Sequence, residues 1–123
     1  MMFNQADNQL IWKNGELIKW DDSNVHILSH TLHYGTGVFE GVRAYQTSTK
    51  GGAIFRLEDH TSRLFNAASK LNINIPYSVK EINKAQIDVL KANNLEEAYI
   101  RPIVYLGNES LGLRATDLSV NVL

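Results

Sequence analysis

A tyrosine and an arginine stand two positions apart in an otherwise apolar segment, and this pair is the clearest candidate for binding chemistry. Residues 98–106 read AYIRPIVYL, which places Tyr99 and Arg101 among aliphatic neighbours. Side chains two residues apart in a strand point to the same face, so the hydroxyl and the guanidinium would lie together. Because an isolated charge is costly to bury, Arg101 needs an anionic partner. That partner is either an internal acid such as Glu40 or the carboxylate of a substrate, and the residue types leave both open.

A second arginine, Arg63, falls on the border between the polar and apolar faces of an expected helix over residues 57–72. In that position it is either a solvated surface group or a binding group for phosphate. The second reading rests on the planar guanidinium, whose fixed fork suits paired contacts with phosphate oxygens.

Three histidines, His26, His30 and His33, are spaced like metal ligands on a helix face. Their segment is short and interrupted by glycine, and no carboxylate stands at a matching spacing. We therefore expect structural or interface histidines and no metal site. No lysine lies in an apolar setting that would make it a Schiff-base nucleophile, so the chain shows binding groups without a complete catalytic set.

The elements that position these groups are arranged around residues 30–45, HTLHYGTGVFEGVRAY. Gly35 and Gly37 allow a tight turn or a close approach to a ligand. The alternation of Val38, Glu40 and Val42 then predicts one continuous strand. An ordinary core strand with a glycine-rich entry is the alternative to a binding strand.

Before this stretch, residues 9–20 predict a hairpin that turns at Asn14-Gly15, residues 25–27 a brief strand, and residues 29–34 one helical turn capped by Ser29. After it, a hairpin turn at Gly51-Gly52 leads into a return strand over residues 53–55. An amphipathic helix follows over residues 57–72, with Leu57, Leu64, Phe65, Ala68 and Leu71 as its apolar stripe.

Ser78 and Glu81 form the capping box of a second helix, which has Ile82, Ile87, Val89 and Leu90 on its apolar face and ends at Asn93-Asn94. Residues 98–106 and the alternating segment 117–123 are the last predicted strands. This order predicts an α+β fold, a two-layer sandwich of a mostly antiparallel sheet with two helices on one face.

The composition is that of one soluble globular domain. The chain has 123 residues, 44% hydrophobic and 20% charged, with a net charge of -1 and no cysteine. These values favour a cytoplasmic protein, and they give no argument for nucleic acid or membrane as a partner. The first ten residues lack a signal-peptide pattern. Because Leu123 interrupts an alternating strand, we expect residues 1–123 to be the amino-terminal small domain of a longer protein.

Four motifs in order, HTLHYGTGVFEGVRAY, the helix with His60 and Arg63-Leu64, AYIRPIVYLG and GNESLGL, resemble the branched-chain amino acid aminotransferases. These are pyridoxal-phosphate enzymes of fold type IV. The resemblance extends from about Leu10 to Leu123. It implies transfer of an amino group between leucine, isoleucine or valine and 2-oxoglutarate. It also implies that the Schiff-base lysine lies downstream of Leu123, so the chain alone is expected to be inactive.

The resemblance assigns a role to each candidate residue. Arg63 would bind the cofactor phosphate, and Tyr99 and Arg101 the substrate carboxylates. Phe39 would line the aliphatic pocket, while Tyr34 and Leu113 would reach the pocket of a neighbouring subunit in a homodimer or larger homo-oligomer. Two relatives of the fold type, D-amino acid aminotransferases and aminodeoxychorismate lyases, are alternatives. A non-catalytic binding or dimerisation module is another.

Overall fold

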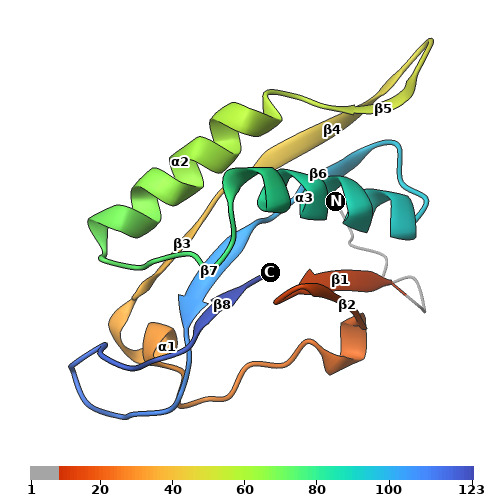
Figure 1. The fold of residues 1–123 in the computed structure, drawn as a ribbon. Coiled ribbons are helices and arrows are strands. Elements are labelled where there is room, and N and C mark those ends of the chain that lie inside the picture. The colour runs from red at the N-terminus through yellow and green to blue at the C-terminus, as the bar shows by residue number, and fades with distance from the viewer. Residues whose placement is uncertain (1–8) are drawn as a thin grey trace.

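The computed structural model describes residues 9–123 and shows helices packed on one side of antiparallel strands (Figure 1). The elements are β1 (Leu10–Lys13), β2 (Glu16–Lys19), the 3-10 helix η1 (Trp20–Asp22), α1 (His30–Tyr34), β3 (Gly37–Phe39), β4 (Val42–Thr47), β5 (Gly51–Ile54), α2 (Leu57–Lys70), α3 (Val79–Ala92), β6 (Ala98–Ile100), β7 (Ile103–Leu106) and β8 (Val120–Val122). The strands form three sheets, β1-β2, β3-β7-β8 and β5-β4-β6. All pairings are antiparallel, which confirms the predicted α+β class. The amino-terminal residues 1–8, on which the absence of a signal pattern partly rests, lie outside the described part.

The hairpin β1-β2 turns at Asn14-Gly15 as predicted, with both residues at positive φ. The prediction of a brief strand over residues 25–27 is wrong, because the backbone forms a turn at this point instead. His26 accepts a hydrogen bond from the Ser29 amide at 2.9 Å through its carbonyl. Its ring Nδ1 accepts another from the Leu28 amide at 3.1 Å. The predicted helical turn is α1, which ends at Gly35 with φ 67°, although the Ser29 side chain makes no capping bond.

Two predicted long strands are each broken in the middle. The run predicted as one strand from Val38 onward is β3 and β4, separated by Glu40 and Gly41. Residues 98–106 are β6 and β7, separated by Arg101 and Pro102, since proline has no N–H for a ladder. The two breaks lie side by side, because the Glu40 amide donates to the Pro102 carbonyl at 3.0 Å. The diagonal ribbons of Figure 1 therefore change from one sheet to the other at this level.

The β4-β5 hairpin turns earlier than predicted. Its turn is residues 48–50, while Gly51 and Gly52 lie within β5. The Thr47 hydroxyl donates to the Gly51 carbonyl at 2.7 Å and accepts from the Lys50 amide at 3.0 Å, which closes the turn. Gly52 is needed for close approach, because a Cβ there would lie 2.5 Å from the Glu96 carbonyl oxygen.

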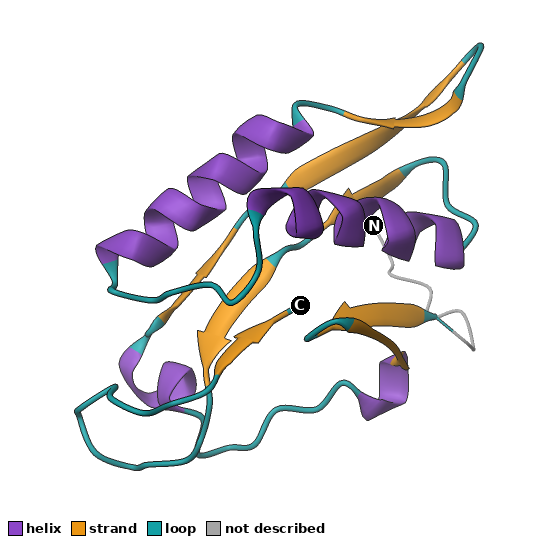
Figure 2. Cartoon of the chain, in the orientation of Figure 1, coloured by secondary structure: helices purple, strands orange, loops and turns teal. Residues whose placement is uncertain are grey.

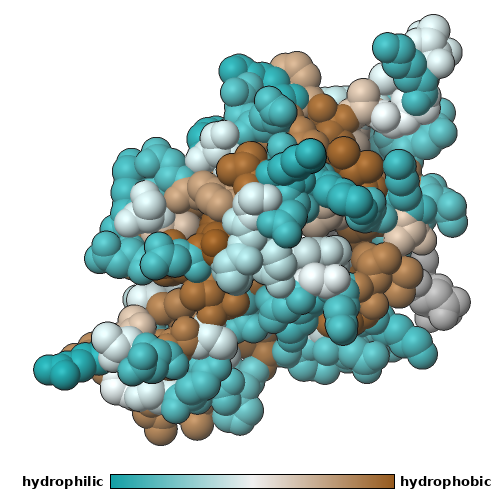
Figure 3. Space-filling view, viewed as in Figure 1, coloured by the Kyte–Doolittle hydropathy of each residue, from teal (hydrophilic) through white to brown (hydrophobic). Residues whose placement is uncertain are grey.

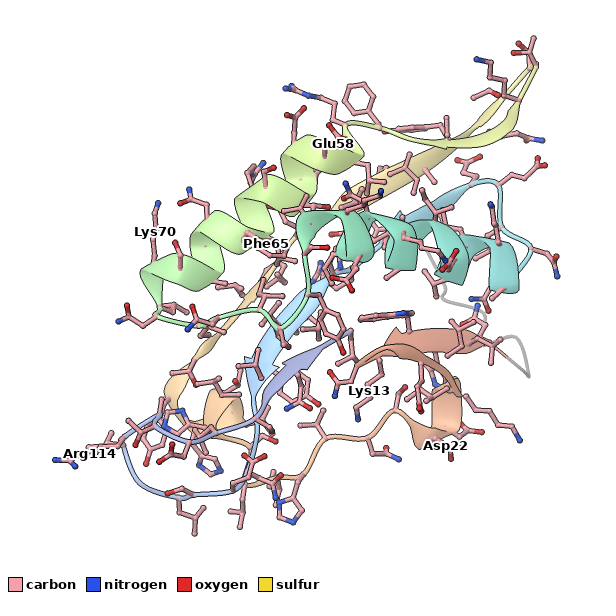
Figure 4. All side chains as sticks on the ribbon, viewed as in Figure 1. Lys13, Asp22, Glu58, Phe65, Lys70 and Arg114 are labelled. Atoms are coloured by element: carbon pink, nitrogen blue, oxygen red, sulfur yellow. The ribbon has the colours of Figure 1, made fainter. Side chains whose placement is uncertain are left out.

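Helices α2 and α3 cover one face of the strands, in purple over orange in Figure 2. The capping box of α3 is present as predicted, with Ser78 and Glu81 each bonding the other's backbone. The core is a cluster of seven buried side chains, Leu64, Ala68, Ile73, Ile82, Val104, Leu106 and Val122. Phe65 packs against this cluster from the inner side of α2 (Figure 4). Leu71 and Ile87, both predicted on apolar faces, are exposed.

Within residues 9–123 no helix is long and apolar enough to cross a membrane.

Candidate functional site

Phe39, Tyr99 and Arg101 form a cluster beside the two strand breaks. The Arg101 Nη2 donates to the Tyr99 hydroxyl at 2.8 Å. The Arg101 guanidinium carbon lies 4.4 Å from the centre of the Phe39 ring and 5.4 Å from that of Tyr99. Such distances are those of cation–π contacts. The cluster therefore places a cation, a hydroxyl and an apolar ring within contact of one another.

Strand geometry turns this cluster away from the helices. In β6, Ile100 is buried while Tyr99 is half exposed, and in β3 Val38 packs on the core while Phe39 is 60% exposed. Because side chains alternate along a strand, the exposed members face the side that α2 and α3 leave open. The cluster is thus accessible to a ligand.

Gly41 fixes the position of Tyr99, and this role has no signal in the sequence beyond the glycine itself. A Cβ at Gly41 would lie 2.4 Å from the Tyr99 hydroxyl oxygen. Only a residue without a side chain leaves room for the tyrosine where it now stands.

The internal acid considered as a partner for Arg101 is engaged elsewhere. Arg101 is exposed, because the strand break places it outside both ladders. In the described part of the chain no carboxylate forms an ion pair with it. Glu40, the acid that the sequence suggested, pairs with two residues of α2 instead. Of the two alternatives, the internal partner is therefore wrong.

Glu40, His60 and Arg63 form a second cluster on the helix side of the strands. The Glu40 carboxylate is 7% exposed and uses both of its oxygens. Oε2 lies 2.9 Å from His60 Nδ1, and Oε1 lies 3.1 Å from Arg63 Nε. His60 and Arg63 lie three residues apart on α2, so their side chains share one face of the helix. Neither bond to Glu40 was predicted.

Tyr34 and Leu113 lie at another part of the molecule, where α1 meets the loop of residues 107–119. The Tyr34 hydroxyl donates to the Leu111 carbonyl at 3.3 Å, and Leu113 is 80% exposed. Figure 3 shows apolar surface at the lower left, where Figure 1 places α1 and this loop. Among the described residues, no hydrogen bond or aromatic contact joins Tyr34 or Leu113 to the Phe39 cluster.

The base of this loop is closely held while its tip extends outward. A hydrogen bond from the Ser119 hydroxyl, and to a smaller extent one from the backbone N–H of Glu109 itself, holds the pKa of the Glu109 carboxyl below its usual value. The Gly107 amide donates to the Ser119 carbonyl at 2.9 Å. Figure 4 shows Arg114 pointing away from the body of the molecule. The loop is therefore anchored at both ends, and its tip is exposed at Leu111 and Leu113.

The three clustered histidines have separate partners. His26 accepts from the Leu28 amide, and His33 Nε2 lies 2.8 Å from the Ile27 carbonyl. The buried His30 places Nδ1 2.7 Å from the Thr36 hydroxyl. In the part of the chain that the structure covers, no three metal-ligating side chains gather in one place. These histidines brace the segment that leads into β3.

A family model described as amino-transferase class IV matches residues 37–122, which include both clusters and both strand breaks. The chain belongs to the class IV aminotransferases.

Among curated relatives of this class IV aminotransferase is the branched-chain-amino-acid aminotransferase of Pseudomonas aeruginosa. It is 57% identical over 114 residues, which are 93% of this chain and 37% of the relative. The Escherichia coli K12 enzyme of the same name is 45% identical over 103 residues, which are 84% of this chain and 33% of the relative. The chain thus spans about a third of the length of these relatives.

Solved structures of such enzymes share the fold of this class IV aminotransferase. The Escherichia coli branched-chain amino acid aminotransferase aligns with a TM-score of 0.89 and 41% identity, over 94% of this chain and 38% of its own. The enzyme of Thermobaculum terrenum, solved in its PLP-form (holo-form), aligns with a TM-score of 0.81 and 32% identity. That alignment covers 96% of this chain and 39% of the other. At these identities the relationship extends to the whole described fold.

Proposed function

We propose that this chain is the amino-terminal part of a branched-chain amino acid aminotransferase that uses pyridoxal 5'-phosphate. Its reaction exchanges an amino group between leucine, isoleucine or valine and 2-oxoglutarate in the cytoplasm. The observation that carries the proposal is the contact of the Arg101 guanidinium with the Phe39 ring and the Tyr99 hydroxyl. The names of the relatives at 57% and 45% identity support it.

The cluster suits a pocket that must accept two kinds of side chain. Phe39 supplies an apolar wall for a branched aliphatic chain. Arg101 supplies a cation for the distal carboxylate of glutamate, and Tyr99 a hydroxyl for a carboxylate oxygen. Because an apolar pocket distinguishes one methylene by only about 1–3 kcal/mol, the three branched substrates are expected to overlap.

Arg63 has the chemistry to hold the phosphate of the cofactor. Its Nε forms an ion pair with Glu40, whereas its side chain is 72% exposed and its terminal nitrogens have no ion-pair partner within residues 9–123. Two N–H-bearing terminal nitrogens fixed in a plane match the oxygens of a phosphate. When bound, pyridoxal phosphate supplies the electron-accepting ring that makes the α-proton of the amino acid removable. The lysine that moves this proton belongs to a second, larger domain in our proposal.

To test the proposal, the full-length protein from this reading frame is supplied with pyridoxal phosphate, leucine and 2-oxoglutarate, and glutamate formation is measured. We expect turnover by the full chain and none by residues 1–123 alone. Arg101→Ala should reduce kcat/KM for 2-oxoglutarate by about 10-fold or more, the loss of a charge-assisted hydrogen bond, and affect leucine less.

Three outcomes would replace the proposal. Preference for D-alanine would indicate a D-amino acid aminotransferase, and release of pyruvate from aminodeoxychorismate would indicate a lyase. A full-length protein that binds no cofactor would indicate a non-catalytic module.

The active form in our proposal is a homodimer or larger homo-oligomer, in which Tyr34 and Leu113 reach the pocket of a neighbouring subunit. The exposure of Leu113 and the outward tip of its loop support this. Leu113→Glu should shift the full-length protein toward monomer in sedimentation and lower its turnover. Lys50→Glu, an exposed change in the distant β4-β5 turn, is the control and should alter neither. A Leu113→Glu protein with unchanged assembly and turnover would contradict this role.

A further inference from the structure

The Glu40 side chain is buried at the strand break and has its two oxygens directed at one helix. A carboxylate that is 7% exposed must be matched by donors, because an unpaired buried charge is costly. Both partners come from α2: His60 Nδ1 forms a hydrogen bond with Oε2, and Arg63 Nε forms an ion pair with Oε1. The Glu40–Arg63 pair differs from the arginine–carboxylate pair at the start of α2, Arg56 and Asp59, whose side chains are both more than half exposed.

The atom through which Arg63 is held determines what the rest of its side chain can do. The Glu40 carboxylate meets Arg63 at Nε, in an ion pair of 3.1 Å, which draws the stem of the side chain toward the strands and leaves the two terminal nitrogens at the far edge of the guanidinium. A bond at a terminal nitrogen would occupy that edge instead. His60 holds the other carboxylate oxygen, so Glu40 cannot turn away from Arg63 without losing its hydrogen bond to His60.

We propose that Glu40 and His60 are positioning residues that orient Arg63 toward the phosphate of the cofactor. This inference rests on the proposed function, in which Arg63 contacts that phosphate. Glu40 acts through its carboxylate alone at this site. Its backbone amide is used separately, in the 3.0 Å bond to the Pro102 carbonyl beside Arg101. A side-chain substitution at Glu40 therefore leaves the backbone link to the substrate cluster in place.

The inference is tested on the full-length protein by comparing the binding of pyridoxal 5'-phosphate with that of pyridoxal, which lacks the phosphate. In Glu40→Gln a single amide oxygen faces two donors and the negative charge is lost. We expect its affinity for pyridoxal 5'-phosphate to fall about 10-fold, with the affinity for pyridoxal unchanged. Glu40→Met, which removes both acceptors at similar volume, should lower the ratio of the two affinities at least as much.

Two further variants separate positioning from a general loss of structure. His60→Leu removes the second bond to Glu40 and should lower the same ratio. His60→Asn carries an N–H near the place of the histidine Nδ1 and should restore most of it. Asp59→Asn, which removes the carboxylate of the exposed pair on the same helix, is the matched control and should leave the ratio within about twofold.

A double substitution tests whether Glu40 acts through Arg63. Lysine has no N–H at the position of the arginine Nε, so in Arg63→Lys the carboxylate has lost the group that it orients. Adding Glu40→Gln to Arg63→Lys should then change phosphate-dependent binding by less than about twofold.

Each outcome decides between the inference and its alternatives. Two results would overturn the inference, provided that the unchanged protein binds the cofactor. In the first, Glu40→Gln lowers the affinities for pyridoxal and pyridoxal 5'-phosphate equally. In the second, Glu40→Gln has its full effect on phosphate-dependent binding even when Arg63→Lys is present. If the unchanged protein binds neither compound, the proposed function fails together with the inference.

Discussion

Two arginines of this chain are held by different chemistry, and the difference suits the two tasks that we propose for them. Arg63 is paired with a buried carboxylate, which directs its guanidinium and neutralises part of its charge. Arg101 rests on two aromatic rings and a hydroxyl, none of which carries a negative charge. An arginine without an anionic neighbour retains its full attraction for an incoming carboxylate. We therefore expect Arg101 to bind a carboxylate more strongly than Arg63 does.

The Tyr99–Arg101 bond depends on the missing side chain of Gly41. In Gly41→Ala the new Cβ would lie 2.4 Å from the Tyr99 hydroxyl oxygen, so the tyrosine must move and release Arg101. We expect KM for both amino acid and oxo acid substrates to rise about 3- to 10-fold, the effect of one hydrogen bond. Because the obstructed atom is the tip of a side chain, the thermal unfolding temperature should change little. Steady-state kinetics and thermal unfolding of the full-length protein measure the two effects.

Tyr99→Phe provides the control for this prediction. It removes the hydroxyl that the alanine would strike, so the two substitutions should not be additive in KM. Equal effects of Gly41→Ala in the presence and absence of the hydroxyl would show that the glycine acts by another route.

Sequence alternation was sufficient to place Tyr99 and Arg101 together, because that relation depends on two positions in one segment. The partner of Glu40 could not be found in this way. It depends on where α2 crosses the strands, 20 residues further along the chain, and residue spacing carries no information about that crossing.

At the scale of elements, the two amphipathic helices and the capping box of α3 were predicted well, whereas the Ser29 cap and the strand breaks were not. The capping box of α3 is a local pattern of two residues, and the structure contains it. The run from Val38 to Ala44 alternates without interruption although the backbone changes sheets at Glu40. Pro102, which cannot donate to a ladder, lies at the break of the neighbouring segment between β6 and β7. Alternation reports which face a side chain takes, and it does not report which sheet a strand joins.

The start of α3 should respond to pH through Glu81. The backbone N–H of Ser78, followed by its hydroxyl, holds the pKa of Glu81 below the usual 4.5. A lowered pKa stabilises the fold above the usual value, and that stabilisation is lost as pH falls through the lowered one. Wild type should therefore be more stable than Glu81→Gln near neutral pH, and this advantage should shrink below pH 4.5. Urea unfolding at several pH values measures it.

Glu97→Gln is the matched control for this titration, because Glu97 is exposed and lies outside both long helices. Its stability difference from wild type should not show the change seen with Glu81→Gln. A difference for Glu81→Gln that stays constant from neutral to acidic pH would contradict the role of the capping box.

At the scale of the whole molecule, one turn residue joins the first hairpin to the last strand. The Asn14 side-chain oxygen accepts from the Val122 amide at 2.8 Å, and its side-chain nitrogen donates to Asn121 at 2.9 Å. The Asn14 amide donates to the Val122 carbonyl at 2.9 Å. The linked residues are 108 positions apart. This contact closes the described fold between its two ends.

Asn14→Gly should weaken the contact between the first hairpin and β8 without straining the turn. Glycine accepts the positive φ of this position but offers no acceptor to the buried Val122 amide. We expect a loss of about 1–3 kcal/mol in the free energy of unfolding and faster hydrogen exchange at the Val122 amide. Asn24→Gly, which changes an exposed loop asparagine, should leave that exchange unaltered. Unchanged protection at Val122 in Asn14→Gly would refute the link.

The paired strand breaks also bear on how this chain could evolve. Arg101 lies between two ladders and belongs to neither, so its side chain can be exchanged without removing a strand from either sheet. If Arg101 binds substrate as we propose, a substitution at this position would change the acids that the pocket accepts, while the core around Leu64 and Val104 stays as it is. Because of the break, the proposed substrate preference could change by substitution at Arg101 without a change in the hydrogen bonding of either sheet.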